Sequence, residues 1–341
     1  MKRIFLILGA AALVLAGCAQ APAAEQEVVN IIFDTDIGND IDDTEALDIL
    51  FKYQDEGKIN LMGICLNKTG IETEQFTGVM CKWYGYPDTP VGMVGDGTYG
   101  FTPASECYTG KALRLTNEDG TPVFEKPEWD YGNLPEACAL YRKLLAEAED
   151  NSVTIVSVGF LTNLFHLINS PADEISPLTG LELIEKKVKM LSIMAGRFNA
   201  EVPEYNVMCD IPAAKQIAEQ WPTETAYLSW ELGDQVHYPA ESIENDFSWT
   251  PAHPLKETYI RYGEMPYNNT MFDPTAVAYA VEPEYFTTGE AGVVTIDEQG
   301  VSRFTASPEG NTHVIYLSDE QTETLLGHFV DILTRKPACK N

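Results

Sequence analysis

Basic residues are scarce in this sequence of 341 residues. It has 22 lysines and arginines against 52 aspartates and glutamates, which gives a formal net charge of −30. A surface this acidic repels phosphate backbones and anionic lipid headgroups, which argues against nucleic-acid binding and against membrane contact through a basic patch. A neutral or cationic ligand, or one reached through a bound metal ion, fits the charge better. An acidic composition that serves only solubility is an equally good explanation.

Cysteine and histidine patterns typical of zinc sites are also missing. The seven cysteines form no CxxC pair and only five histidines occur, so a structural zinc site is not indicated. With Cys18 lipidated, as argued next, the other cysteines remain in an oxidising compartment where disulfides can form. The sequence does not choose among the pairings.

Long apolar runs are absent beyond the N-terminus. Lys2 and Arg3 precede the run 4–16, which is too short to span a bilayer and is typical of a signal-peptide core. The run ends in Leu-Ala-Gly-Cys, which resembles a bacterial lipobox with Cys18 as the lipidated residue. We expect a lipoprotein signal peptide over residues 1–18 and a tether over 19–27. The protein would then be an exported bacterial lipoprotein, at the cell surface or in the periplasm, that contacts the membrane only through its lipid anchor.

After residue 27, apolar β-prone runs alternate with helical patterns. Continuous apolar runs such as VTIVSV at 153–158, followed by helices, indicate an α/β fold with a mostly parallel sheet covered by helices on both faces. With no internal repeat and no strong linker, residues 28–341 are expected to form one domain. The expected strands are 28–33, 59–66, 91–94, 153–158, 188–194, 226–230, 292–296 and 313–317. The expected helices are 43–56, 72–84, 134–148, 211–219, 274–281 and 318–335. The stretches 96–133 and 232–270, rich in glycine, proline, asparagine and aromatics, are expected to be long loops.

Five aspartates lie within ten residues at the end of the first expected strand: Asp34, Asp36, Asp40, Asp42 and Asp43. Ligands of parallel α/β sheets bind at the carboxyl ends of strands. Carboxylates this close repel one another unless they are protonated, strongly hydrated or neutralised by a cation, and hard oxygen ligands favour Ca²⁺ or Mg²⁺. Two other interpretations stay open. One is a solvated turn that caps the next helix, and the other is an EF-hand-like loop, against which the glycine position and the preceding strand argue.

The segment 34–43 resembles the N-terminal signature of the inosine–uridine-type nucleoside hydrolases, a strand followed by DxDxG and a DD pair that opens a helix. Residues 34–38 match its start and Asp42-Asp43 match the pair, with two residues more between them than in the best-studied branch. The resemblance implies that Asp36 is the general base and holds Ca²⁺ with the attacking water. It implies Asp43 as a second Ca²⁺ ligand, Asp42 as a ligand of ribose hydroxyls and Asp34 as support behind the loop. The longer spacing leaves open that Asp40 takes one of these roles.

Three further segments match the family in the same order. GFLTNL at 159–164 resembles a turn in which the backbone carbonyl of Thr162 is a calcium ligand. The segment 194–214 resembles the one that closes over the sugar, with Glu204, Asn206 and, less directly, Asn199 toward the ribose hydroxyls. Asp273, before Pro274, resembles a helix start whose aspartate ligates calcium. Ordinary helix capping and turn chemistry are the structural alternatives for these segments. Together the matches span residues 31–280 and imply a single-domain, nucleoside-hydrolase-like fold.

The sequence departs from the family at the residue before Asp273. The best-studied members carry histidine there, whereas this chain has Phe272, which can stack on a base but cannot donate a proton to it. No histidine replaces it by position, although His237 and His253 lie in the stretch 232–270. Other candidates for contacts with a base are Tyr205, Tyr238, Tyr267 and Trp230. The acid that protonates the leaving group is therefore not identified.

The resemblance implies an enzyme that hydrolyses the N-glycosidic bond of a nucleoside or related N-riboside, using Ca²⁺ and a water activated by Asp36. One alternative is a surface lipoprotein that binds a nucleoside or sugar through calcium without turnover, which Phe272 and the anchor motivate. A second is a DxD-type phosphotransferase with Asp34 as nucleophile, disfavoured because Gly38 stands where such sites usually carry Thr or Val. The leaving base is open. A homo-oligomer is compatible with the family.

Overall fold

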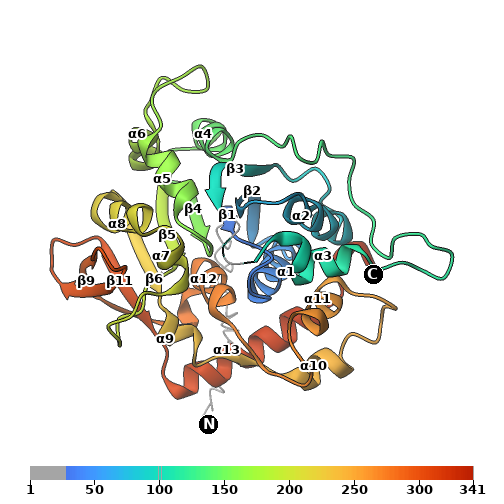
Figure 1. The fold of residues 1–341 in the computed structure, drawn as a ribbon. Helices are drawn as coiled ribbons and strands as arrows, with labels where there is room; N and C mark the ends of the chain where they lie inside the picture. The colour runs from blue at the N-terminus through green and yellow to red at the C-terminus, as the bar shows by residue number, and fades with distance from the viewer. Residues whose placement is uncertain (1–27, 99, 101, 341) are drawn as a thin grey trace, which may run out of the picture.

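The centre of the molecule is a nine-stranded sheet (Figure 1). The computed structural model describes residues 28–98, 100 and 102–340, so the expected signal peptide, the lipidated Cys18 and the tether lie outside the described residues. The strand order is β10-β9-β11-β6-β5-β4-β1-β2-β3. The bounds are β1 Val29–Thr35, β2 Ile59–Lys68, β3 Val91–Thr98, β4 Val153–Ser157, β5 Val188–Met194, β6 Glu224–Leu228, β9 Thr287–Ile296, β10 Ser302–Ala306 and β11 Thr312–Tyr316.

Most of this sheet is parallel, as expected. β1 lies between β2 and β4 and is parallel to both. The antiparallel pairs of this sheet are those that β9 makes with β10 and with β11, near one edge. The expected strand 226–230 is placed two residues too late, because β6 ends at Leu228 and Trp230 begins the short helix α9 (Trp230–Gly233). β10 was not expected. Neither was the separate two-stranded sheet of β7 (His237–Tyr238) and β8 (Asn269–Thr270).

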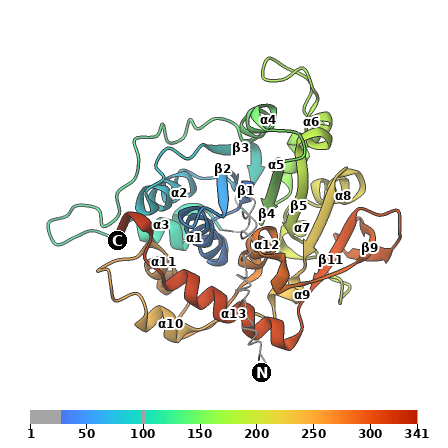
Figure 2. The same ribbon diagram turned by 180° about the vertical axis from the view of Figure 1, so that it is seen from behind.

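Helices cover both faces of the sheet, which confirms the expected layers (Figures 1 and 2). β1 shows why: Ile31 and Phe33 belong to one apolar core and Ile32 to the other, since successive side chains point to opposite faces. The first core includes α1 (Asp42–Asp55), α2 (Ile71–Tyr84), α12 (Phe272–Val281) and α13 (Asp319–Thr334). The second includes α4 (Ala137–Glu147), α5 (Thr162–Asn169), α6 (Gly180–Lys187) and α8 (Ile211–Gln220).

The two expected loops are wrong in part, because each contains short helices. The stretch 96–133 holds η1 (Ala104–Glu106) and α3 (Tyr108–Leu113), and 232–270 holds α10 (Ala240–Asn245), α11 (Pro254–Tyr262) and the strands β7 and β8. These helices have at most nine residues, too few for apolar periodicity to show. Tertiary packing holds them: the Tyr108 ring meets Phe76 and Tyr262 edge-on.

The remaining short elements are α7 (Tyr205–Cys209), η2 (Pro283–Tyr285) and η3 (Ala338–Lys340). All six cysteines in the described part of the chain are unpaired thiols. No helix within the described ranges combines the length and apolar character needed to cross a membrane.

Candidate active site

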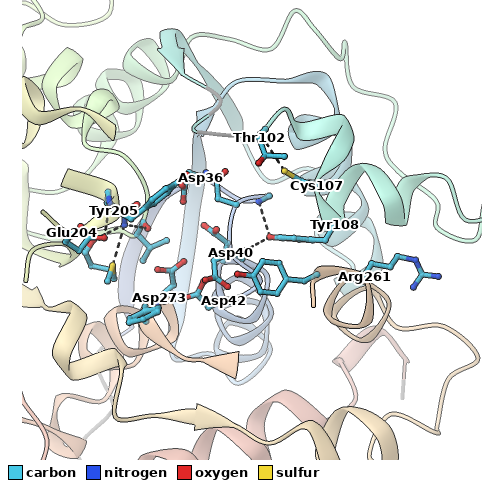
Figure 3. A pocket seen from close by; sticks show the side chains of 18 of the residues that line it. Asp36, Asp40, Asp42, Thr102, Cys107, Tyr108, Glu204, Tyr205, Arg261 and Asp273 are labelled. Carbon is cyan, nitrogen blue, oxygen red and sulfur yellow. Dashed lines mark hydrogen bonds between the residues drawn. The ribbon is translucent and has the colours of Figure 1, made fainter. Parts of the chain in front are cut away.

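A cavity of about 570 Å³ opens at the carboxyl edge of the parallel strands. The loop after β1 and the start of α1 contribute Asp36, Asp40, Asp42 and Asp43 to its wall. Segments that follow β4 and β5, together with the starts of α7 and α12, contribute Val158, Met194, Glu204, Tyr205, Asn206, Phe272 and Asp273. Figure 3 shows Asp40, Asp42 and Asp273 converging at the centre, with Glu204 and Tyr205 on one side and Tyr108 on the other. Segments far apart in the chain thus meet here, as the strand ends predict.

Three carboxylates form the core of the site. Asp42, Asp43 and Asp273 are buried, and one oxygen from each lies within 4.8 Å of the others. The backbone N–H of Asp273, in the first turn of α12, donates to Asp42 Oδ2 at 3.0 Å. Thr35 donates its hydroxyl to Asp43 and accepts the N–H of Ile37 at 3.1 Å. The N-termini of α1 and α12 therefore bring these carboxylates together.

The charges of this cluster would be stabilised by a bound cation. Burial raises the pKa of Asp42, Asp43 and Asp273 well above the ordinary value, and the charges of neighbouring carboxylates raise it further. Buried, mutually repelling carboxylate oxygens are the donor set that a hard divalent cation takes. The residues present therefore fit a bound metal ion of this class.

The cluster differs in membership from the ligand set that the resemblance implies. It contains Asp42, for which a sugar contact was expected, and it does not include Asp36. Thr162 does not line the cavity among the described residues. Thr162 begins α5, and its hydroxyl donates to Asp210 at 2.6 Å. Asp40 lies in the wall with a hydrogen bond from Tyr262 and is not part of the three-residue cluster.

Asp36 lies in the same wall and is suited to accept a proton near neutral pH. Burial raises its pKa to about 6, opposed chiefly by a hydrogen bond from Asn39 and by the charge of Lys68. Asn39 Nδ2 lies 2.5 Å from Asp36 Oδ2. A carboxylate whose pKa lies close to the working pH is an effective general base.

Asp34 has a different environment, behind the loop. It is fully buried and accepts hydrogen bonds from the Tyr141 hydroxyl at 2.9 Å, from Asn163 Nδ2 at 3.0 Å and from Asn67. It is not among the residues that line the cavity, where a nucleophile has to be. This arrangement gives no support to the phosphotransferase hypothesis.

Glu204 and Asn206 face the cavity from the start of α7. The Glu204 carboxylate accepts the backbone N–H groups of Asn206, Val207 and Gly196 at 2.8, 3.2 and 3.3 Å, which fixes its orientation. Asn206 donates its amide N–H groups to the carbonyls of Val158 and Met194, so its Oδ1 is left to accept from a ligand hydroxyl. Asn199 is exposed and accepts from Arg197 Nε at 3.1 Å, outside the cavity lining.

Aromatic side chains form another part of the wall. The Phe272 and Trp230 rings lie 6.1 Å apart, and the Arg197 guanidinium stacks 3.7 Å from the centre of the Trp230 ring. No histidine occurs among the described lining residues. His253 is buried among aromatic rings and His237 is exposed elsewhere. Of the aromatic candidates, Tyr205 and Trp230 line the cavity, whereas Tyr238 and Tyr267 do not.

Several residues in the cavity wall or directly behind it were not expected, among them Asn39, Lys68, Tyr108 and Tyr262. Asn39 lies in the extra length of the acidic loop, and Lys68 lies two residues after the second expected strand, whose carboxyl end shares the edge with the first. The positions of Asn39 and Lys68 in the sequence could therefore have identified both as site residues. Tyr108 and Tyr262 come from stretches interpreted as loops, where the sequence offered no signal.

The fold and the site define an α/β protein with an acidic cavity at the carboxyl edge of a parallel sheet. Three buried aspartates in this cavity are arranged as they would be to hold a metal ion. A sequence model of the family described as inosine-uridine preferring nucleoside hydrolase matches residues 31–324, and the chain belongs to this family. A sequence search of curated proteins found no match.

Solved structures agree on the fold. A plant nucleoside hydrolase is similar with a TM-score of 0.69 at 19% identity, over 91% of this chain and 100% of that one. An inosine-uridine preferring nucleoside hydrolase from Bacillus anthracis has a TM-score of 0.65 at 17% identity, over 89% and 100%. A purine-preferring ribonucleoside hydrolase from Gardnerella vaginalis has a TM-score of 0.67 at 16% identity, over 89% and 98%.

Proposed function

We propose that this protein hydrolyses the N-glycosidic bond of a nucleoside or related N-riboside, with Ca²⁺ bound and with Asp36 as the general base. The observation that carries the proposal is the meeting of Asp36, the Asp42–Asp43–Asp273 cluster and the Glu204–Asn206 pair in one cavity. Family membership supports the reaction class. Calcium is favoured because the cluster offers only carboxylate oxygens.

The roles of the side chains follow from their positions. A bound Ca²⁺ would orient the attacking water and the sugar hydroxyls. As water attacks the anomeric carbon, Asp36 takes a proton from that water, and the glycosidic bond breaks with its electron pair leaving on the base. Glu204 and the Oδ1 of Asn206 hold ribose hydroxyls, because both are fixed by backbone hydrogen bonds and face the cavity. The carboxylates of the wall stabilise the positive charge that develops on the sugar ring. Phe272 and Trp230 offer apolar faces to a planar leaving group.

The test is release of p-nitrophenol from p-nitrophenyl riboside, with calcium and then with chelator. Nitrophenolate leaves without a proton, so the assay does not depend on the acid that Phe272 replaces. We expect calcium-dependent release that Asp36→Asn abolishes. Calcium-independent release, or full activity of Asp36→Asn, contradicts the proposal.

A second candidate is a binding protein that holds the same ligand without turnover. Phe272 favours it, because the cavity presents an aromatic ring at the position where the family pattern carries histidine. Calorimetry would then show calcium-dependent binding of a nucleoside that stays intact for hours. Conversion of the bound nucleoside to free base excludes this candidate.

We also propose that the protein is anchored through Cys18, on the strength of the lipobox resemblance. Metabolic labelling with a radioactive fatty acid should mark the full chain and not a Cys18→Ala variant. Labelling that persists in Cys18→Ala contradicts the anchor.

A further inference from the structure

A buried lysine lies directly behind the wall of the cavity. Lys68 is the last residue of β2, and its side chain is fully buried. Its ammonium group donates to Asn39 Oδ1 at 2.6 Å and to the Thr102 carbonyl at 2.7 Å. Lys68 itself is not among the residues that line the cavity, whereas Asn39 is. The contact of Lys68 with the cavity wall is therefore made through Asn39.

The lysine fixes which way the Asn39 amide points. An ammonium group only donates hydrogen bonds, so it requires the amide oxygen. The amide nitrogen is then turned toward Asp36, and Asn39 Nδ2 lies 2.5 Å from Asp36 Oδ2. The reversed amide would set its N–H groups against the ammonium and its oxygen against the carboxylate, and both contacts are repulsive. Lys68 and Asp36 together thus permit only one orientation of the Asn39 amide.

The loop that carries Asn39 is built to keep it there. The additional residues of this loop, compared with the family signature, lie between Gly38 and Asp42. Asn39 belongs to this segment. Gly38 has φ of +118°, a conformation that L side chains rarely adopt, and its backbone N–H donates to the Tyr108 hydroxyl at 3.0 Å. The Lys68 stem passes 3.4 Å from where a Cβ of Gly38 would be. A side chain at position 38 would strain the turn, and its Cβ would come within 3.2 Å of Thr109 Oγ1.

We propose that Lys68 and Asn39 form a positioning relay for Asp36, in which the lysine fixes the Asn39 amide and the amide fixes the carboxylate that accepts the proton. The proposal rests on the proposed function, since it takes Asp36 as the general base. Lys68 is a positioning residue in this relay, since it does not line the cavity. The electrostatics agree with the last step, because the hydrogen bond from Asn39 is the largest influence that lowers the pKa of Asp36 against burial.

The kinetic test uses Lys68→Met, which keeps the length of the side chain without its charge, Asn39→Ala, and the double variant. We expect each single variant to lower kcat about 10- to 100-fold with KM within about threefold, as for groups that orient a reacting residue. The double variant should be no worse than Asn39→Ala, because residues acting in series are not additive. Lys187→Met is the matched control: Lys187 also donates to a backbone carbonyl, that of Ala148 at 2.6 Å, away from the cavity. It should keep wild-type kcat.

The outcomes separate the relay from the proposed function. The contrary result is a double variant that loses more kcat than Asn39→Ala, by the same factor that Lys68→Met alone loses. That result would show that the lysine acts independently of Asn39 and would overturn the relay. If the wild-type protein turns over no riboside, the proposed function fails, and crystal structures decide the relay. The relay is supported if the hydrogen bond between Asn39 and Asp36 is lost in Lys68→Met and kept in Lys187→Met. An unchanged Asn39 in Lys68→Met overturns it.

Discussion

Asp34, Asp36 and Asp42 show how the surroundings of a buried side chain assign different chemistry to the same residue type. Asp34 is enclosed by three hydrogen-bond donors, Asp36 faces the cavity, and Asp42 belongs to the carboxylate cluster. The strand–loop–helix pattern was enough to predict that these residues gather. It could not predict which of them form the carboxylate cluster, because membership depends on where α12 places Asp273, far along the chain.

At Asp36 the expected consequence is a loss of turnover without loss of the fold. Asp36→Asn removes the proton acceptor and keeps the shape of the side chain, so we expect kcat to fall by about 10²- to 10⁴-fold, the usual range for a general base. The midpoint of thermal unfolding should not fall, because an amide costs less to bury than a carboxylate. Steady-state kinetics and a thermal melt on the same sample give both values. A variant that unfolds below the wild-type midpoint contradicts this account.

Asp34 and Glu204 give the calcium-free protein a defined pH dependence. Burial raises the pKa of each to about 7, from ordinary values of 3.8 and 4.5. The folded state therefore keeps protons that the unfolded state releases as the pH rises above 4. The contribution of these two groups to the free energy of unfolding should fall from about pH 4 to pH 7 and level off above. Urea titrations in a calcium chelator measure it, and Glu204→Gln should flatten the slope. A contribution that rises over this window contradicts the pKa directions.

At the scale of elements, α3 holds the acidic loop in place. The Tyr108 hydroxyl donates to the Asp40 carbonyl at 2.7 Å and accepts from the Gly38 N–H at 3.0 Å and from the Thr44 hydroxyl at 3.2 Å. A single atom of a short helix thus contacts both sides of the turn. The sequence did not reveal this role, because Tyr108 lies in a stretch too irregular to predict as a helix.

Removal of that hydroxyl should loosen the loop. We expect Tyr108→Phe to lower the free energy of unfolding by about 1–3 kcal/mol, because it leaves buried polar groups unpaired. Tyr131→Phe is the control: its hydroxyl makes one hydrogen bond, to the Pro127 carbonyl, in a half-buried position, and its loss should cost less than about 1 kcal/mol. Equal losses in the two variants, measured by urea unfolding, would show that Tyr108 has no special role in the loop.

The strands and long helices were predictable for a reason that the short helices lack. Runs such as residues 153–158 are mostly apolar and show no strict alternation with polar residues, because both faces of the sheet are covered, and this signal is local. α10 and α11 have no comparable signal, since their apolar residues meet partners from distant segments. The position of β6 was two residues off because Trp230 continues the apolar run beyond the strand into α9.

At the scale of the whole molecule, calcium should stabilise the fold. A ligand present at 100 times its Kd that binds only the folded state adds about 2.7 kcal/mol, which raises the midpoint of thermal unfolding by several degrees. The increase should be larger at pH 8 than at pH 5, because the cluster must lose its protons to bind the cation. Thermal melts with calcium and with chelator at both pH values test this. An Asp273→Asn variant should lose most of the increase. No difference between calcium and chelator contradicts a calcium site.

The contact between Asp42 and Asp273 joins residues 231 positions apart in the chain. A cation held by both would act as a removable cross-link that closes most of the polypeptide into a ring. For a permanent cross-link around a ring of this size, the chain-entropy model gives a stabilisation on the order of 5 kcal/mol, an upper limit for a reversible one. None of the six described cysteines is paired, so the cation would do for this fold what a disulfide does elsewhere. Its withdrawal should then open the chain to proteases at the loop after β1 before the rest of the sheet yields.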